Sequence, residues 1–378
     1  MESVGLALIG SGFMGRSHAL AFHCVKSVFG DEVPRVRFEL QCDRTTERAE
    51  AMRERFGFAR ATADWRDLLK DDSIDVVAIT TPNRLHCEMA VGALRAGKHV
   101  ICEKPMGVSL AEGEEMAAAA RESGCVTMLG YNYTKSPAFL HAARLVDDGV
   151  LGRPYYFRGV MDEDYMASED LEWSWRCLRS QAGLGALGDM GCHVFSKALR
   201  LMGPVESLVG EVETLHATRP KAAEDGGGVG EVENEDRATA MLRFKSGASG
   251  LFSTSRTVWG RKCHLAWEVH GTLGTLVFTQ ERMNELNLYL RSDAAGESGF
   301  RRIITGPAHP PYGEFVPAPG HSVGFTSQKT IEVGEFLRAV RSGGDVYPNF
   351  GDGLEIERTI WAIAESAERG SERVVVQR

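Results

Sequence analysis

The feature that most constrains the fold is a glycine loop that directly follows an apolar run near the start of the chain. Residues 5–9 read Gly-Leu-Ala-Leu-Ile and residues 10–15 read Gly-Ser-Gly-Phe-Met-Gly, after which a helical pattern begins. Gly10 permits a tight turn, Gly12 lets a pyrophosphate approach the backbone, and Gly15 lets strand and helix pack closely. The helix dipole would then face the phosphates. The loop residues expected to bind a dinucleotide are Gly10, Gly12, Phe13, Met14 and Gly15.

The first third of the chain alternates between strand-like and helical segments. Four of its five expected strands are short apolar runs without polar alternation, which is typical of strands covered on both faces. This order predicts an α/β fold with a Rossmann doubly wound parallel sheet over residues 1–130. We expect strands at residues 5–9, 36–42, 74–80, 99–103 and 126–130, and helices at 15–27, 46–56, 84–96 and 110–123.

The pattern changes after about residue 150. Short strand-like runs joined by tight turns predict a C-terminal α+β domain with a large, mainly antiparallel open sheet. With 378 residues, two domains are the default, so we assign residues 131–378 to substrate binding and oligomerisation. Helices are expected at residues 188–202 and 354–368, and the second could pack back on the first domain. Strands are expected at 155–160, 205–214, 238–244, 250–257, 265–270 and 274–278.

Composition excludes several classes of function. A formal net charge of −9, with no run of Lys and Arg, argues against nucleic-acid binding. No stretch approaches the roughly 20 apolar residues of a membrane helix, and the first apolar run lacks the basic start of a signal peptide, so we expect a cytoplasmic protein. The 8 cysteines are scattered without a Cys-x-x-Cys pair, which favours reduced thiols. Cys192 and His193 are adjacent but lack a second ligand pair, so no metal site is expected.

Asp43 marks the end of the second expected strand. A carboxylate there can accept hydrogen bonds from both adenine-ribose hydroxyls and repels a 2′-phosphate, which favours NAD. Arg44 could instead contact such a phosphate or stack on adenine, so NADP stays open. The separation of Asp43 from Gly15 exceeds the usual roughly 20 residues. A long loop at residues 29–35 would account for the difference.

Lys104 lies in Glu103-Lys104-Pro105, directly after the fourth expected strand. Ligands of open parallel sheets bind at this carboxyl edge. A lysine there can donate to a substrate hydroxyl and ease its loss of a proton. The alternative is a surface ion pair between Lys104 and Glu103.

Asp189, His193 and Lys197 are spaced four residues apart, which places them on one face of a helix. His193 can accept a proton from an alcohol as hydride leaves, while Asp189 orients the imidazole. A solvated helix face would show the same spacing. Upstream, Arg176 could donate to a polyhydroxylated substrate and Trp175 could stack on a sugar ring, although a packing tryptophan with a structural arginine is equally compatible.

Together these motifs resemble the Gfo/Idh/MocA family of oxidoreductases, and the resemblance covers nearly the whole chain. It implies NAD-dependent oxidation of a ring hydroxyl, with Lys104, Asp189 and His193 as the catalytic residues. The segments that carry it are Gly10–Gly15, Thr81–His86, Glu103–Pro105 and Gly188–His193. Further cofactor contacts that it implies are Thr81, Pro82, Asn83, His86, Glu103, Lys104 and Asn132. The substrate contacts inferred from the residues and the resemblance are Lys104, Asn132, Trp175, Arg176, Asp189, His193 and His321.

Within the family, residues 173–176, 233–236 and 306–328 are similar to scyllo-inositol dehydrogenases that accept L-glucose and to levoglucosan dehydrogenases. The expected substrate is therefore a cyclic polyol or sugar, with levoglucosan or another aldose or anhydrosugar as the alternative. A non-catalytic NAD(H)-sensing regulator is the alternative of another class. The family also implies a homotetramer, in which His321 could reach a neighbour's active site. Many members carry a further Asp where this chain has Lys197.

Overall fold

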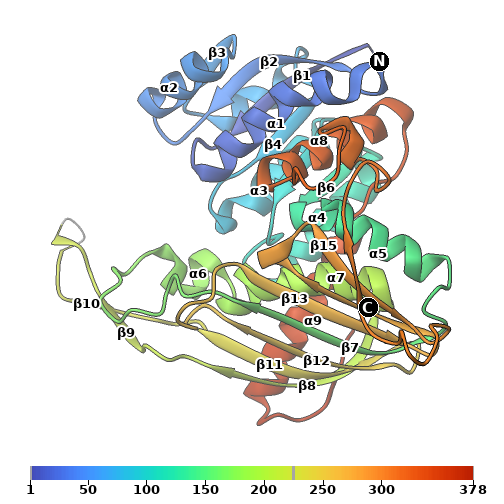
Figure 1. Cartoon of the computed structure of the whole chain (residues 1–378). Coiled ribbons are helices and arrows are strands. Elements are labelled where there is room, and N and C mark those ends of the chain that lie inside the picture. The colour runs from blue at the N-terminus through green and yellow to red at the C-terminus, as the bar shows by residue number, and fades with distance from the viewer. Residues whose placement is uncertain (1, 224–225, 378) are drawn as a thin grey trace. The chain divides into compact units, whose positions relative to one another are not determined.

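The computed structural model describes residues 2–223 and 226–377. Figure 1 shows the whole chain, and its contacts divide it into two compact units. The first unit contains Met1–Lys135 together with Val323–Leu354, and the second contains Ser136–Ser322 together with Glu355–Arg378. A segment from late in the chain is thus part of the first unit. Each unit is described separately below.

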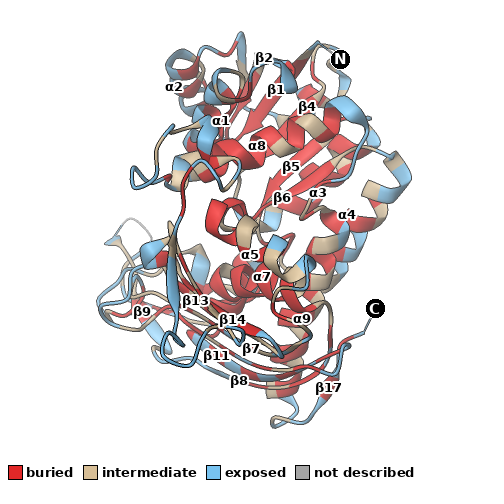
Figure 2. Cartoon of the chain, turned by 45° about the vertical axis from the view of Figure 1, so that its right-hand side comes forward, coloured by how far each residue is buried: buried red, intermediate tan, exposed pale blue. Residues whose placement is uncertain are grey.

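The described part of the first unit contains a six-stranded parallel sheet with the strand order β3-β2-β1-β4-β5-β6. This is the order of the doubly wound dinucleotide-binding fold, and it confirms the predicted fold class. Figure 2 shows that β1, β4, β5 and β6 are largely buried, which explains why their sequences are continuous apolar runs. The strands are β1 Ser3–Ile9, β2 Arg35–Cys42, β3 Arg60–Thr62, β4 Val76–Ile79, β5 His99–Glu103 and β6 Thr127–Gly130.

The described part of the first unit contains the four helices that were expected between its strands, and one further α-helix that was not expected. Helix α8, Phe325–Ser342, packs against α1 although the two are far apart in sequence. Eleven of its residues are buried, and several of these are polar. The helix therefore shows no regular apolar spacing in the sequence, and it was not predicted. The other α-helices are α1 Phe13–Phe29, α2 Thr46–Phe56, α3 His86–Arg95 and α4 Leu110–Ser123.

The second unit is built on a sheet that has nine strands among the described residues, in the order β16-β15-β14-β13-β7-β12-β11-β8-β17. Neighbouring strands are antiparallel except for β7 and β12, which pair in parallel. Strand β11 alternates exposed and buried residues, so one face of the sheet carries the core and the other is open. The strands are β7 Pro154–Asp162, β8 Val205–Glu213, β11 Arg237–Phe244, β12 Ser249–Ser255, β13 His264–Gly271, β14 Gly274–Thr279, β15 Glu285–Leu290, β16 Arg301–Ile304 and β17 Val374–Val375.

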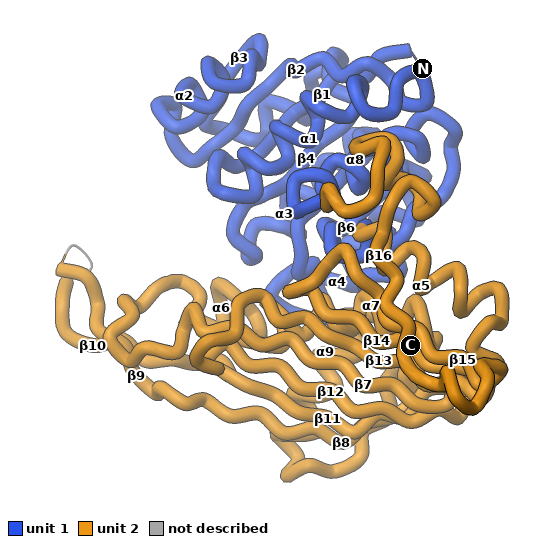
Figure 3. Tube along the Cα trace, viewed as in Figure 1, with its two compact units in different colours: residues 1–135, 323–354 blue, residues 136–322, 355–378 orange. Residues whose placement is uncertain are grey.

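The helices of this unit differ from expectation: α5 and α6 were not predicted, α9 begins four residues before the expected residue 354, and the helix expected at 188–202 is divided. The single helix expected at residues 188–202 is a π-helical turn, Leu187–Gly191, followed by α7, Cys192–Met202. Figure 3 colours the two units and places α7 in the second, where it packs on β7. The remaining α-helices are α5 Pro137–Asp147, α6 Arg179–Ala182 and α9 Phe350–Glu368, and β9 Thr218–Pro220 pairs with β10 Val229–Glu231.

Among the described residues, none of the helices has the length and apolar character required to span a membrane.

Candidate active site

Each of the three glycines of the loop is needed for a different physical reason. Gly10 has φ 105°, and a Cβ there would lie 2.5 Å from Thr80 Oγ1. A Cβ on Gly15 would lie 2.1 Å from the carbonyl oxygen of Gly10. A Cβ on Gly12 would meet no heavy atom within 4 Å. Packing within the chain therefore requires Gly10 and Gly15, whereas the space beside Gly12 is open, as a ligand that approaches the backbone needs.

The N-terminus of α1 is suited to an anion. Gly12 is the N-cap residue and makes no side-chain cap, and the first turn contains no acidic residue. The helix therefore presents N–H groups and the positive end of its dipole without a competing carboxylate from that turn. Phe13 is 63% exposed and its ring lies 5.5 Å from that of Phe325. The residues present fit the pyrophosphate of a dinucleotide.

Asp43 lies at the end of β2, beside the loop, as predicted from its position. One carboxylate oxygen accepts from the backbone N–H and hydroxyl of Ser11, at 2.8 and 2.5 Å. The other accepts from the Arg44 N–H at 2.7 Å and from Arg48 Nε at 2.9 Å. Burial opposes ionisation of Asp43, but these hydrogen bonds and the charge of Arg48 outweigh it and lower its pKa. A ribose hydroxyl would have to displace Ser11 or Arg48, whose side chain is 47% exposed.

The loops after β4 and β5 are joined by His86. Its Nδ1 lies 2.8 Å from the carbonyl oxygen of Pro105 and its Nε2 lies 2.8 Å from that of Thr81. Both ring nitrogens thus contact backbone, and the ring is buried. His86 therefore fixes the relative positions of the two loops that contain the predicted contacts Pro82, Asn83 and Lys104.

Glu103 and Asn132 end neighbouring strands of the sheet. The Glu103 carboxylate is buried and binds His18 and Lys329. Asn132 follows β6 and is 3% exposed, and its Nδ2 has no hydrogen-bond partner among the described residues. A buried amide donor without an acceptor is costly, so a ligand oxygen at Asn132 would be favourable.

In the second unit, Asp189 and His193 lie on consecutive turns. Asp189 belongs to the π-helical turn, and His193, which is 5% exposed, belongs to α7. The Glu235 carboxylate accepts the Leu187 N–H at 2.8 Å and so stabilises the start of the π-helical turn. Such π-helical turns are frequent at functional sites.

Tyr165 is a site residue that the sequence did not reveal. Its hydroxyl donates to Asp189 Oδ2 at 2.6 Å. Tyr165 is 36% exposed, but desolvation around its hydroxyl and the Asp189 charge raise its pKa well above the ordinary value, so the phenol stays protonated and donates. No motif surrounds Tyr165, and only the fold brings it to Asp189.

Lys197 follows His193 by one turn of α7, and both residues are buried. Its side chain is fully buried, with Nζ 3.3 Å from the His193 carbonyl oxygen and 5.6 Å from the centre of the Phe139 ring. Burial lowers its pKa to about 7. The spacing correctly places Lys197 one helical turn after His193, but the Lys197 side chain lies in the protein core.

The remaining predicted substrate contacts lie at the surface of the second unit. The Arg176 guanidinium lies 4.5 Å from the Trp175 ring centre, and Asn234 Nδ2 donates to the Arg176 carbonyl at 2.9 Å. Trp175 is partly exposed. Its ring therefore packs against Arg176 and also remains accessible to a ligand. His321 is exposed in the segment between β16 and α8.

Comparisons with known proteins agree with these features. A model for the oxidoreductase family with an NAD-binding Rossmann fold (Gfo/Idh/MocA) matches residues 4–131, and a model for the Gfo/Idh/MocA C-terminal domain matches residues 139–277. The chain belongs to the Gfo/Idh/MocA family of oxidoreductases. It is therefore an NAD-dependent enzyme of a family of sugar and polyol dehydrogenases.

Individual members of the family differ in how much of the chain they match. Levoglucosan dehydrogenase from Pseudarthrobacter phenanthrenivorans is 37% identical, over 98% of both chains. The scyllo-inositol 2-dehydrogenase (NAD(+)) of Bacillus subtilis is 29% identical over 73% of both. A solved levoglucosan dehydrogenase in complex with NADH and L-sorbose superimposes with a TM-score of 0.96 at 36% identity, covering 100% of each chain.

Proposed function

We propose that this family member oxidises a ring hydroxyl of an anhydrosugar of the levoglucosan class, with NAD as the hydride acceptor. The support is the extent of similarity to levoglucosan dehydrogenase, which reaches 98% of the chain, against 73% for the scyllo-inositol enzyme. Sequence motifs alone ranked cyclic polyols first. Scyllo-inositol and L-glucose become the second candidate class, supported by the similarity to the scyllo-inositol 2-dehydrogenase.

The observation that carries the dehydrogenase chemistry of this proposal is the Tyr165–Asp189 hydrogen bond, one helical turn before the buried His193. Asp189, held by the Tyr165 hydroxyl, is the group suited to stabilise the His193 cation that forms when the imidazole accepts the hydroxyl proton. Lys104, from the loop after β5, donates a hydrogen bond to the same substrate oxygen and stabilises its developing negative charge. Bound NAD supplies the hydride acceptor. The substrate carbon loses hydride, its oxygen loses a proton to His193, and a carbonyl forms.

Replacement of His193 by alanine tests the assignment of the base. We expect His193→Ala to lower kcat by about 10²–10⁴-fold, because general-base catalysis contributes on that order, while NADH affinity changes little. His141→Ala, on α5 outside the proposed site, is the matched control. Steady-state kinetics and fluorescence titration with NADH measure the two quantities. Loss of NADH affinity with unchanged kcat would assign His193 to cofactor binding instead.

A regulator that binds NAD(H) without turnover is the candidate of another class. The presence of Lys104, Asp189 and His193 in one chain counts against it, since a sensor needs no proton acceptor. The two functions differ in a single result, the formation of NADH from any sugar.

The open face of the nine-stranded sheet supports self-association. The face is hollowed by about 650 Å³ and presents Met241 and Leu251, which are 54% and 42% exposed. Apolar faces of this kind mark interaction surfaces. We propose that the face pairs with the same face of another copy in a homotetramer, and that His321 contributes to a neighbour's substrate site.

A further inference from the structure

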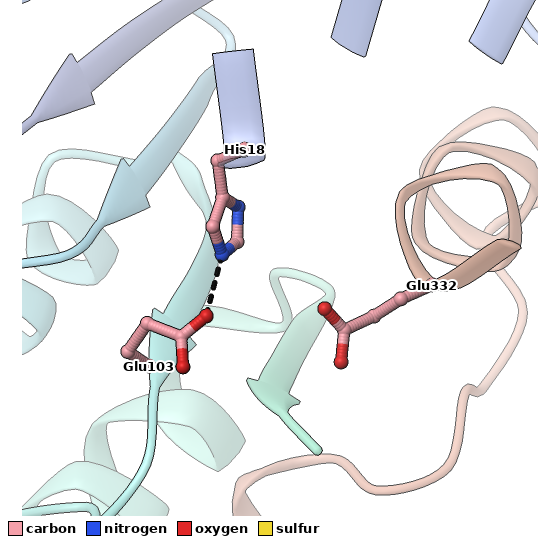
Figure 4. A group of neighbouring side chains, drawn as sticks. All are labelled: His18, Glu103 and Glu332. Carbon is pink, nitrogen blue, oxygen red and sulfur yellow. Dashed lines mark hydrogen bonds and ion pairs between the residues drawn. The ribbon is translucent and has the colours of Figure 1, made fainter. Parts of the chain in front are cut away.

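A group of four buried ionisable side chains, which we call the charge cluster, lies in the first unit at the end of β5. His18 comes from α1, Glu103 from β5, and Lys329 and Glu332 from α8. Figure 4 shows the His18 ring directed at Glu103 and the Glu332 carboxylate directed from α8 toward the other two. Glu103 is 5% exposed and the other three are fully buried.

Lys329 is the cation at the centre of the charge cluster. Its Nζ lies 2.8 Å from Glu103 Oε1 and 2.5 Å from Glu332 Oε2. His18 Nε2 lies 2.7 Å from the same Glu103 oxygen. The ligand atoms of the histidine and the two carboxylates lie within 4.8 Å of one another, close enough for a metal ion. The Lys329 ammonium already supplies the positive charge between the carboxylates, so we interpret the group as an ion cluster.

The charges of the cluster do not balance without one additional proton. Two carboxylates, one ammonium and a neutral imidazole leave one buried negative charge, and an unbalanced buried charge is costly. Two buried atoms have no hydrogen-bond partner among the described residues, namely Glu332 Oε1 and His18 Nδ1. Either could hold the missing proton.

Burial decides which residue holds it. Burial raises the pKa of Glu332 to about 7, because desolvation outweighs the attraction of Lys329. Burial also lowers the pKa of His18, and Lys329 adds to that effect. Glu103 keeps its charge, since Lys329 and His18 overcome its own desolvation and hold its pKa far below the usual range. The other cation that acts on Glu332 is Lys135, which is bound to Glu335 at 2.5 Å.

The position of the charge cluster relates it to one half of the cofactor. In a sheet of order β3-β2-β1-β4-β5-β6, a dinucleotide lies across the carboxyl ends of the strands, with one nucleotide on each side of the switch point. Asp43 places the adenosine half at β2, so the nicotinamide half extends toward β5 and Glu103. The nicotinamide ring is a cation in NAD⁺ and neutral in NADH.

We propose that the charge cluster makes the preference for oxidised over reduced cofactor depend on pH. With its extra proton the cluster is neutral and treats the two forms alike. When Glu332 releases that proton to solvent, the cluster carries one negative charge, which attracts the nicotinamide cation and leaves neutral NADH unaffected. NAD⁺ binding in turn favours release of the proton, because the two events are thermodynamically linked. The proposal uses cofactor binding alone and does not depend on the sugar substrate.

Binding measurements on the wild-type protein test this linkage. Between pH 6 and 8.5 we expect NAD⁺ affinity to rise about three- to tenfold, the size of a single partly screened charge interaction, and NADH affinity to change less than about twofold. Calorimetry in buffers of different ionisation enthalpy should show release of a fraction of a proton on NAD⁺ binding near pH 7, and none on NADH binding. Zero proton release with NAD⁺ would overturn the proposal without any variant.

The variant Glu332→Gln assigns the effect to the cluster. Glutamine keeps the shape of the side chain but cannot ionise, so the affinity ratio of NAD⁺ to NADH should become independent of pH. Glu122→Gln, at an exposed position of α4, should retain the wild-type dependence. An unchanged pH dependence in Glu332→Gln that still binds NADH would exclude Glu332 as the source.

Discussion

At the scale of single residues, the chemistry depends on charges that the fold holds in unusual surroundings. Asp43 is ionised through Ser11 and Arg48, whereas Lys197 is buried one turn from His193 and its pKa falls to about 7. Asp43 could be predicted because strand ends are readable in sequence. Tyr165 could not, because its hydroxyl donates to Asp189, which lies 24 residues away in the sequence, and no motif surrounds it.

Lys197 leads to a prediction about stability and pH. Because its folded pKa is lowered, its favourable contribution is present above its unfolded pKa and is lost as pH falls through about 7. Lys197→Met should therefore raise the free energy of unfolding by about 1–3 kcal/mol more at pH 6 than at pH 9. Urea titrations at both values measure this, with the exposed Lys245→Met as control. An equal change at both pH values would mean that Lys197 is charged in the folded protein.

At the scale of elements, different glycines of the loop serve folding and cofactor binding. Gly12→Ala should leave the melting temperature near that of the wild type, because its Cβ meets open space and its φ of −68° suits alanine. It should nevertheless weaken NADH binding by roughly tenfold or more, since the methyl group occupies the approach of the pyrophosphate.

Gly15→Ala should behave in the opposite way. Its Cβ would overlap the Gly10 carbonyl, so the melting temperature should fall by several degrees, as overpacking typically costs about 1–3 kcal/mol. Thermal denaturation and NADH titration of both variants distinguish the roles. Tight NADH binding by Gly12→Ala would contradict the pyrophosphate assignment.

Some helices and strands could be predicted from the sequence and others could not. Long apolar runs identified β1, β4, β5 and β6, because burial on both faces leaves a clear pattern. Helix α8 and strands β15 and β16 were not predicted, since α8 buries polar residues such as Gln328 and Lys329, and β16 exposes Arg301 and Arg302. The charge cluster was missed for the same reason, as two of its members belong to α8.

At the scale of the whole molecule, the homotetramer that we propose depends on the open face of the nine-stranded sheet. Leu251→Arg should convert the tetramer that we propose to smaller species, because a charge would replace an apolar side chain in the paired faces. Leu273→Arg, in the turn between β13 and β14 and 48% exposed, should leave assembly unchanged. Light scattering coupled to size-exclusion chromatography measures the mass. A tetramer that persists in Leu251→Arg would place the interface elsewhere.

The most direct test of the account is NADH formation with a panel of levoglucosan, other anhydrosugars, scyllo-inositol and L-glucose. We predict that levoglucosan or a related anhydrosugar is oxidised with the highest kcat/KM, and that His193→Ala lowers kcat for it by about 10²–10⁴-fold. A higher kcat/KM for scyllo-inositol or L-glucose would show that the proposed substrate class is wrong and that the proposed dehydrogenase chemistry is right. Failure of every sugar and polyol to yield NADH, by a protein that binds NADH, would contradict the assignment as a dehydrogenase.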